Sequence, residues 1–342
     1  MICDRSFTFV EYKFVIMKTI AILVPEHAVM QAVADPQYCF SAVNQFLIQA
    51  GKLPLFDVKL VGAKEMVTLN FGSYQVNVDA LIDDIQKPDL IFIPALFGDL
   101  KQAVEVNSKL IPWIVKNYAQ GSEVVSLCLG AFLLGATGLL DGRKCSTHWG
   151  FINQFKVMYP DVDVQDGQII TEDERLYSSG GANSYWNLLL HLVEKYTDRE
   201  MAILTAKYFA IDIDRNSQTA FAIFNGQKSH QDEAIKVAQQ FIESNLQEKL
   251  VIEQLADQVA VGRRSFERRF KSATGNTVLE YIQRVKIEAA KRNFESTSMN
   301  ISEVMYKVGY NDEKSFCSTF KKVTGVTPIA YKKKYQKSLF SV

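Results

Sequence analysis

The sequence predicts a doubly wound α/β domain followed by an all-α domain. From Thr19 onward, short apolar stretches of strand character alternate with longer helical stretches, and beyond residue 250 a helical segment is repeated. A length of 342 residues is natural for two domains. Apolar residues make up 48% of the chain, which is enough to build a buried core in each domain.

The N-terminal part contains four strand-like stretches. The first and third are almost entirely apolar, as expected for central parallel strands that are buried on both faces. Helical stretches separate them, which predicts a parallel sheet whose ligand site lies beyond the carboxyl ends of the strands. The strand-like stretches are TIAILVP, FDVKLVG, DLIFIPA and EVVSLCLG, and the helical ones include CFSAVNQFLIQA and SKLIPWIVKNYAQG.

Cys128 follows the fourth strand-like stretch. The run from Val124 to Phe132 has the pattern of a strand, a sharp turn and a helix, which is the geometry of a nucleophile elbow. A helix N-terminus favours a thiolate, so the pattern allows a lowered thiol pKa. The alternative is a small buried apolar side chain. The five cysteines are scattered without a C-x-x-C pair, which predicts a reduced, cytoplasmic protein.

The C-terminal part contains an internal repeat with an offset of 50 residues. Eight of the 17 positions from Ser265 to Tyr281 are identical to those from Ser315 to Tyr331. Typical composition would give about one such identity. A repeat of this length predicts one supersecondary unit that is used twice.

Each copy predicts a helix, a short break with glycine, and a second helix. The second helices carry Phe266 and Phe270, or Phe316 and Phe320, at the i, i+4 spacing of one buried face. Glycine follows each second helix, at a position that favours a left-handed cap. The layout is that of a helix-turn-helix, whose second helix enters a DNA major groove.

The exposed positions of both second helices are rich in polar and basic residues that reach phosphates and base edges. The segment around Tyr281–Phe294 predicts one long helix that spaces the two copies, so that one chain reaches two successive major grooves roughly 34 Å apart. The predicted DNA-binding residues are Arg263, Arg264, Glu267, Arg268, Arg269, Lys271, Glu313, Lys314, Cys317, Ser318, Lys321 and Lys322.

The net charge of zero conceals an asymmetry between the two parts. Residues 228–342 contain 20 basic and 13 acidic residues, a balance of +7. The remaining residues therefore carry 38 − 20 = 18 basic and 38 − 13 = 25 acidic residues, a balance of −7. This distribution favours a nucleic-acid module joined to a domain of another kind. A nucleoid-type protein without sequence preference is a weaker alternative.

The repeat resembles the AraC/XylS family of transcription regulators over residues 240–335. The first signature matches at Gly262, Arg264, Phe266, Arg268 and Phe270, with Gly262 in place of the usual serine cap. The second copy matches the family from Gly309 to Lys332, but Lys314 replaces a serine and Ser318 an arginine. The resemblance implies double-stranded DNA as the partner, with RNA polymerase as a further partner.

The N-terminal part resembles the ThiJ/PfpI superfamily, a flavodoxin-like fold related to class I glutaminases, and most closely its GlxA-type regulators. The resemblance covers residues 18–210 and is most specific over residues 124–149. It implies a domain that senses a small, nitrogenous effector and forms a homodimer. The implied ligand-pocket residues are Glu26, Ala95, Leu96, Cys128, Leu129 and His148.

Three interpretations of Cys128 and His148 stay open at this point. They form a ligand pocket, a vestige of packing, or the catalytic pair of a cysteine-dependent hydrolase or amidase. Related enzymes have an acidic residue after the first strand and a Gly-Gly turn after the third. Pro94, Ala95 and Leu96 occupy that turn here, which favours a sensor over an enzyme.

The predicted organisation has four parts. They are an extension or disordered arm (1–17), the ligand-sensing domain (18–210), a linker (211–231) and the DNA-binding domain (232–342). No apolar run reaches the roughly 18–20 residues of a membrane helix, which predicts no membrane association. No cluster has the spacing of a metal site, and no cofactor is expected.

Overall fold

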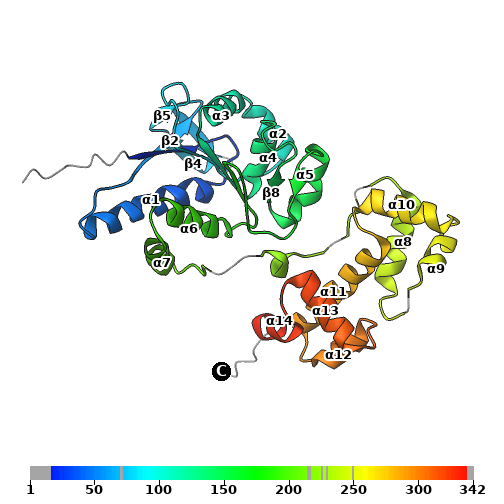
Figure 1. The fold of residues 1–342 in the computed structure, drawn as a ribbon. Helices are drawn as coiled ribbons and strands as arrows, with labels where there is room; N and C mark the ends of the chain where they lie inside the picture. The colour runs from blue at the N-terminus through cyan, green and yellow to red at the C-terminus, as the bar shows by residue number, and fades with distance from the viewer. Residues whose placement is uncertain are drawn as a thin grey trace, which may run out of the picture. The chain divides into compact units, whose positions relative to one another are not determined.

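The structure, a computed structural model, describes residues 17–69, 72–213, 217–224, 226–228, 230–248 and 250–336 (Figure 1). The chain forms two compact units, residues 1–216 and 217–342, here called the N-terminal and C-terminal units. The division falls inside the segment 211–231 that the sequence predicts as a linker. The predicted extension lies outside the described residues except for Met17.

The N-terminal unit is built on a seven-stranded sheet in the order β10-β11-β7-β6-β1-β2-β5. All neighbouring strands are parallel except β10 and β11, which pair antiparallel at one edge. The strands of the sheet are β1 (Lys18–Leu23), β2 (Phe56–Gly62), β5 (Ala80–Leu81), β6 (Leu90–Ile93), β7 (Glu123–Leu127), β10 (Ile170–Asp173) and β11 (Leu176–Ser179). Two small pairs lie outside it, β3 (Met66–Leu69) with β4 (Tyr74–Asn77) and β8 (Lys144–Cys145) with β9 (Asp163–Val164). The four predicted strands are confirmed as β1, β2, β6 and β7.

Helices cover both faces of this sheet, as the sequence predicts (Figure 1). Helices α1, α6 and α7 pack together on one face, and α2, α3 and α4 lie on the other. The helices are α1 (Met30–Gln49), α2 (Leu100–Val106), α3 (Leu110–Ala119), α4 (Ala131–Gly135), α5 (Ile152–Met158), α6 (Tyr185–Tyr196) and α7 (Arg199–Tyr208), with short turns η2 (Cys128–Gly130) and η3 (Trp149–Phe151).

Helix α1 begins nine residues before the start of the predicted helical stretch. Pro36 lies inside it, on the buried face beside Ala32 and Val33. Proline is disfavoured in helix interiors because it lacks the amide donor, so the sequence pattern indicates a helix that starts after it. Burial of the apolar face against the sheet outweighs this local preference.

The C-terminal unit contains seven helices among its described residues. They are α8 (Glu233–Ser244), α9 (Ile252–Gln258), α10 (Arg263–Thr274), α11 (Val278–Ser296), α12 (Ile301–Lys307), α13 (Glu313–Thr324) and α14 (Pro328–Tyr335), preceded by the short turn η4 (Thr219–Phe221). Helices α9 and α10 form the first repeat, and α12 and α13 the second. Two helix-turn-helix units and the long helix between them are thereby confirmed.

Each repeat is built on its own hydrophobic core. The Phe266 and Phe270 rings lie 5.7 Å apart, centroid to centroid, and those of Phe316 and Phe320 lie 5.8 Å apart. The N-terminal half of α11 contributes Tyr281 to the first core, and its C-terminal half contributes Phe294 to the second. The helix therefore belongs to both cores and joins them.

The ends of the two second helices are equivalent. Gly275 (φ 70°) and Gly325 (φ 79°) adopt the left-handed conformation that glycine accepts without strain, as predicted. Beside each glycine a threonine hydroxyl, of Thr274 or Thr324, donates a hydrogen bond to the main chain one turn earlier. Among the described residues, no helix is both long enough and apolar enough to cross a membrane.

Candidate DNA-binding surface and effector pocket

Three exposed basic residues form one row along α10. Arg264, Arg268 and Lys271 are spaced i, i+4, i+7, so they share one face of the helix, opposite the buried phenylalanines. None of the three forms a hydrogen bond or ion pair with a described residue. These side chains, here called the α10 row, are available to a partner.

Three other predicted DNA contacts on α10, Arg263, Glu267 and Arg269, form ion pairs within the protein. The guanidinium of Arg269 binds both carboxylate oxygens of Asp232, at 2.8 and 2.6 Å, and lowers the pKa of that carboxyl. Asp232 caps the N-terminus of α8, so this pair fastens α8 to α10. The contact of Arg269 with DNA stays a prediction, and this pairing within the protein weighs against it. Arg263 pairs with the exposed Glu253 and Glu267.

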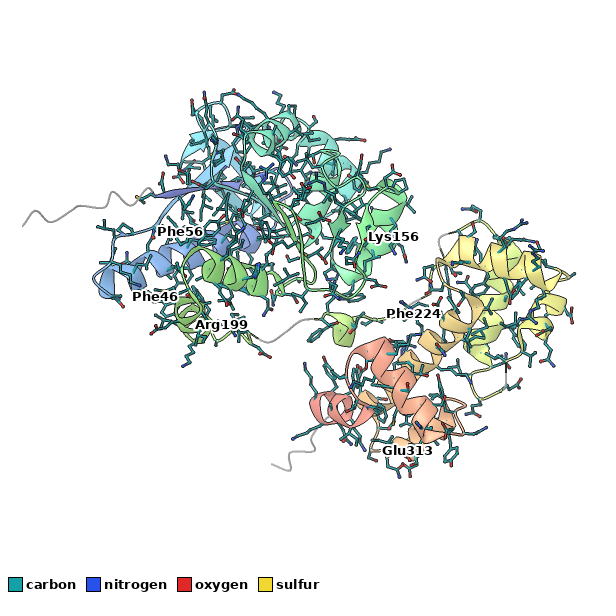
Figure 2. The ribbon with its side chains drawn as sticks, viewed as in Figure 1. Phe46, Phe56, Lys156, Arg199, Phe224 and Glu313 are labelled. Carbon is teal, nitrogen blue, oxygen red and sulfur yellow. The ribbon has the colours of Figure 1, made fainter. Side chains whose placement is uncertain are left out.

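The corresponding row on α13 consists of Lys314, Ser318 and Lys321. All three are exposed and form no hydrogen bond or ion pair with a described residue. Figure 2 labels Glu313 at the first position of this helix. Lys322 is also exposed, whereas Cys317 is half-buried, so the α13 row presents two ammonium groups and one hydroxyl where α10 presents two guanidinium groups and one ammonium.

The N-termini of the two helices differ. Asp312 caps α13 by accepting a hydrogen bond from the backbone N–H of Ser315 at 2.7 Å. Gly262 precedes α10 and provides no side-chain cap. The connection before α13 is also one residue longer than that before α10, which explains why the first helices of the two repeats are 49 residues apart and the second helices 50.

In the N-terminal unit, Cys128 has the conformation of a nucleophile elbow. Its φ angle is +52°, a left-handed value that a non-glycine residue adopts at a cost of about 1–3 kcal/mol. Its backbone N–H donates to the Ser179 hydroxyl at 3.3 Å, and its carbonyl accepts from the Thr147 hydroxyl at 3.2 Å. Neighbouring elements therefore fix the elbow that the sequence predicts.

The thiol of Cys128 is not activated. The side chain is 4% exposed, and burial raises the pKa of Cys128 to about 12, although a backbone hydrogen bond from Leu129 opposes this. The lowered pKa that a helix N-terminus allows is therefore not realised, because desolvation dominates. A neutral thiol at physiological pH is a poor nucleophile.

His148 does not act on this thiol. Its Nδ1 accepts a hydrogen bond from the backbone N–H of Gly150 at 3.1 Å, and its ring packs against Trp149 and Phe151. Burial lowers the pKa of His148, so the imidazole is neutral at pH 7. Within the described residues, no hydrogen bond joins His148 to Cys128. The catalytic-pair interpretation has no geometric support.

The segment after β6 is fixed by the segment after β1. Leu96 is fully buried and forms an isolated bridge with Ala28, and the Ala95 carbonyl accepts from the Val29 N–H at 2.8 Å. Glycine is needed instead at Gly130, because a Cβ there would overlap the Ile93 carbonyl oxygen. Enzymes of the superfamily have glycines in the turn after the third strand, which allow close approach of the backbone. Here the glycine that allows such an approach is Gly130, in the elbow.

The carboxyl that lies beside Tyr185 and Trp186 belongs to Asp35, which the sequence pattern does not single out. Glu26 forms an ion pair with Lys64 at 2.5 Å and, among the described residues, no hydrogen bond joins its side chain to Cys128. Asp35, on α1, accepts hydrogen bonds from the Tyr185 hydroxyl at 2.6 Å and from Trp186 Nε1 at 2.9 Å. Burial, the hydrogen bond to Asp35 and, least, the elbow thiol all raise the pKa of Tyr185. No part of the chain that the structure describes groups three potential metal ligands.

Comparisons with known proteins agree with this architecture. Residues 255–334 match the family model of a helix-turn-helix domain, and residues 46–195 match that of the DJ-1/PfpI family. The N-terminal fold also resembles a crystal structure from Vibrio parahaemolyticus described as a transcriptional regulator protein, with a TM-score of 0.51. The two sequences are 19% identical, and the match covers 56% of this chain and 98% of that chain. That likeness concerns the fold.

Two regulators of Pseudomonas aeruginosa are similar across both domains. The HTH-type transcriptional regulator GbdR is 24% identical over 255 residues, which is 74% of this chain and 68% of that protein. The HTH-type transcriptional regulator CdhR is 24% identical over 261 residues, 74% of each chain. The chain therefore belongs to the AraC-type transcription regulators that carry a DJ-1/PfpI domain at the N-terminus.

Proposed function

We propose that this regulator places α10 and α13 in two successive major grooves of one DNA site. The observation that carries the proposal is the matched pair of exposed rows, each unpaired within the described residues. Helix α11 has 19 residues and is therefore about 28 Å long, close to the roughly 34 Å between successive major grooves. One chain thus suffices to span both half-sites.

The two rows are proposed to differ in what they recognise. Arginine donates in bidentate fashion to guanine, so Arg264 and Arg268 discriminate between bases. Lysine binds phosphate as a point charge, so Lys314 and Lys321 mainly position the second helix. The other proposed contacts are Arg263, Glu267, Lys271, Glu313, Cys317, Ser318 and Lys322.

We infer that the N-terminal unit binds a small nitrogenous effector near Cys128, Leu129 and His148. Asp35 supports this inference. Both of its hydrogen bonds end at Oδ2, so Oδ1 has no hydrogen bond from the described residues. A carboxylate oxygen beside the rings of Tyr185 and Trp186 suits a cationic group.

Dimerisation through the same unit, contact with RNA polymerase and a cytoplasmic location complete the proposal. The domain division that goes with it assigns effector sensing to residues 18–210, linkage to residues 211–231 and DNA binding to residues 232–342. An effector alters DNA binding only if its affinity differs between the arrangements of the two DNA-binding helices.

The DNA proposal is tested by selecting duplexes from a random library with the full-length chain at physiological salt. We expect a recovered sequence with two conserved half-sites. Arg268→Ala should weaken binding to it by about 1–3 kcal/mol and relax the base preference at one position. Arg199→Ala, at an exposed arginine of the N-terminal unit, is the control and should bind unchanged. Recovery of no sequence above the random background would contradict specific recognition.

The effector proposal is tested by thermal shift with a panel of amino and quaternary ammonium metabolites. A compound that binds raises the melting temperature of the full-length chain by mass action. Asp35→Asn should abolish the shift, because it removes the negative charge. Asp57→Asn, at a half-exposed aspartate paired with Lys59, should retain it. Equal shifts in both variants would rule out Asp35 as the recognising group.

A further inference from the structure

The two helix-turn-helix repeats have separate hydrophobic cores, so their spacing depends on whatever bridges them. Helix α11 is one bridge, because it contributes to both cores. A second bridge lies in the segment that the sequence predicts as a linker. Residues 219–224 and 226–228, here called the strap, contact the second repeat at one end and the first repeat at the other. Figure 2 labels Phe224 within it.

The first end of the strap lies against the second repeat. Thr219 lies so close to Gly325, the left-handed cap of α13, that a Cβ on this glycine would come within 2.8 Å of the Thr219 hydroxyl oxygen. The ammonium of Lys334, on α14, lies 4.7 Å from the centroid of the Phe221 ring. Gly325, the cap of α13, therefore also forms part of the surface against which the strap packs.

The middle of the strap is held by a buried ion pair on α11. Glu288 and Lys291 are 7% and 4% exposed and are joined at 2.8 Å. Lys291 also donates to the Ala222 carbonyl at 2.5 Å, and Glu288 accepts from the Phe224 N–H at 3.2 Å. A buried ion pair is costly to desolvate unless additional hydrogen bonds satisfy it. Here the strap's main chain supplies those bonds.

The far end of the strap lies against the first repeat. The Phe224 ring packs edge-on against Tyr281, with the centroids 5.2 Å apart. Gly226 adopts φ +68°, and a Cβ there would overlap the Tyr281 hydroxyl. The Gln227 carbonyl accepts from the fully buried Gln239 at 2.9 Å, and Lys228 pairs with Glu243 of α8 at 2.6 Å. The strap therefore reaches from α13 to α8 along the helix that both repeats share.

A buried lysine adds a further link between the repeats. Lys286, on α11, donates to the Gly309 carbonyl in the turn of the second repeat at 3.1 Å and to the Glu248 carbonyl, after α8, at 3.5 Å. This link is internal to the repeats. The strap differs from it, because it continues directly from the N-terminal unit along the chain.

We propose that the docked strap sets the spacing of α10 and α13 and thereby the gain in affinity from binding both half-sites at once. When the strap is docked, it holds α11 in place. Once one repeat is bound to DNA, the other repeat then binds the second half-site intramolecularly. When the strap is withdrawn, the repeats move independently and the advantage of linked binding falls. The inference rests on the proposed use of both repeats on one DNA site.

The test compares two double variants of the full-length chain. Glu288→Leu/Lys291→Met removes the buried pair and both bonds to the strap while it keeps the apolar stems. Glu233→Leu/Lys236→Met makes the same changes in an i, i+3 pair on α8. Among the described residues, this pair has no hydrogen bond or ion pair with the strap. Both leave the net charge unchanged, so non-specific attraction to DNA is unaltered. Gly226→Ala undocks the strap without changing α11, in case the first variant does not fold.

Two measurements are made on each protein. Amide hydrogen exchange over residues 219–228 reports docking of the strap. The ratio of affinities for the selected duplex and for the same duplex with one half-site scrambled reports linked binding. Linking two modules raises affinity by about 10²–10⁴-fold when their geometry permits both to bind. In the strap variants, we expect faster amide exchange over residues 219–228 and a ratio of affinities at least about tenfold lower. In the α8 control, we expect no change in either measurement.

Three outcomes would overturn the inference. An unchanged ratio in variants whose strap exchanges fast would show that docking does not set the spacing. Unchanged exchange would show that the buried pair does not hold the strap. A ratio of affinities near one in the unsubstituted protein would contradict the two-groove proposal itself, and with it the strap's effect on spacing. This outcome can be told from the other two because it is measured without any variant.

Discussion

The two helix-turn-helix repeats share their scaffold and differ on their surface. The phenylalanine pairs, the threonine hydroxyls and the left-handed glycine caps occupy equivalent positions with nearly equal geometry. In the exposed rows, only Lys271 and Lys321 are the same residue type. The residues that build the helix pair are thus separated from those that we propose to choose the DNA sequence.

This separation explains how one fold can serve two half-sites. The lysine that both rows share provides the proposed phosphate contact, which does not depend on the DNA sequence. Exchanging two guanidinium groups for an ammonium and a hydroxyl changes which bases the helix distinguishes. We therefore expect the first repeat to dominate affinity and the second to distinguish this regulator's sites from those of related proteins.

The largest expected effects are on stability and are equal in the two repeats. Phe270→Ala and Phe320→Ala each remove a fully buried ring, which costs about 3–5 kcal/mol. Hydrogen exchange of the α10 and α13 amides measures the free energy of opening of each repeat separately. If one variant lost stability in both repeats equally, the two cores would not be independent.

The next effect distinguishes the rows. Arg268→Ala should weaken binding to the selected duplex by about 1–3 kcal/mol, whereas Ser318→Ala at the equivalent position should cost clearly less. Fluorescence anisotropy at one fixed salt concentration measures both. A greater loss from the serine substitution would reverse the assignment of the dominant repeat.

The shared lysines provide the matching control for that contrast. Lys271→Ala and Lys321→Ala should weaken all duplexes to a similar degree and lower the salt slope of log K by about 0.9 each, because each removes one phosphate contact. The slope is obtained from affinities measured over a range of salt concentrations. A loss confined to one base sequence would show that the lysine contacts a base edge.

The smallest effects are at the helix caps. Asp312→Ala should destabilise the second repeat by about 1 kcal/mol, since it removes the hydrogen bond to the Ser315 N–H. Gly262→Ser should stabilise the first repeat by a few tenths of a kcal/mol, roughly the difference between these caps. A Cβ at Gly262 meets no atom within 4 Å, so the serine fits. Amide exchange of α10 and α13 would show whether the caps account for this asymmetry.

The sequence predicts the local features of the fold well. The repeat, the glycine caps and the elbow at Cys128 depend on residues that are close in the chain, and the structure contains all three. Alternating apolar stretches identify the central strands for the same reason. Helix α1 is the exception, because Pro36 conceals its first turns until the sheet against which it packs is known.

Features that depend on distant residues were not predictable from pattern. Helical spacing places Arg269 nearer the buried face of α10 than Arg268, but no local pattern identifies its partner. Arg269 binds Asp232, 37 residues away, whereas Arg268 faces solvent. Cys128 resembles an activated nucleophile in sequence, but its burial raises its pKa. Asp35 accepts hydrogen bonds from Tyr185 and Trp186 only because α1 and α6 pack together.

The most direct test of the central claim is a hydroxyl-radical footprint of the full-length chain on its selected duplex. If α10 and α13 occupy successive major grooves, protection should fall in two regions about one helical turn, or roughly 34 Å, apart. Arg268→Ala should weaken the protection at one region more than at the other. Protection of a single groove, with the same affinity for the intact and the half-scrambled duplex, would contradict the claim.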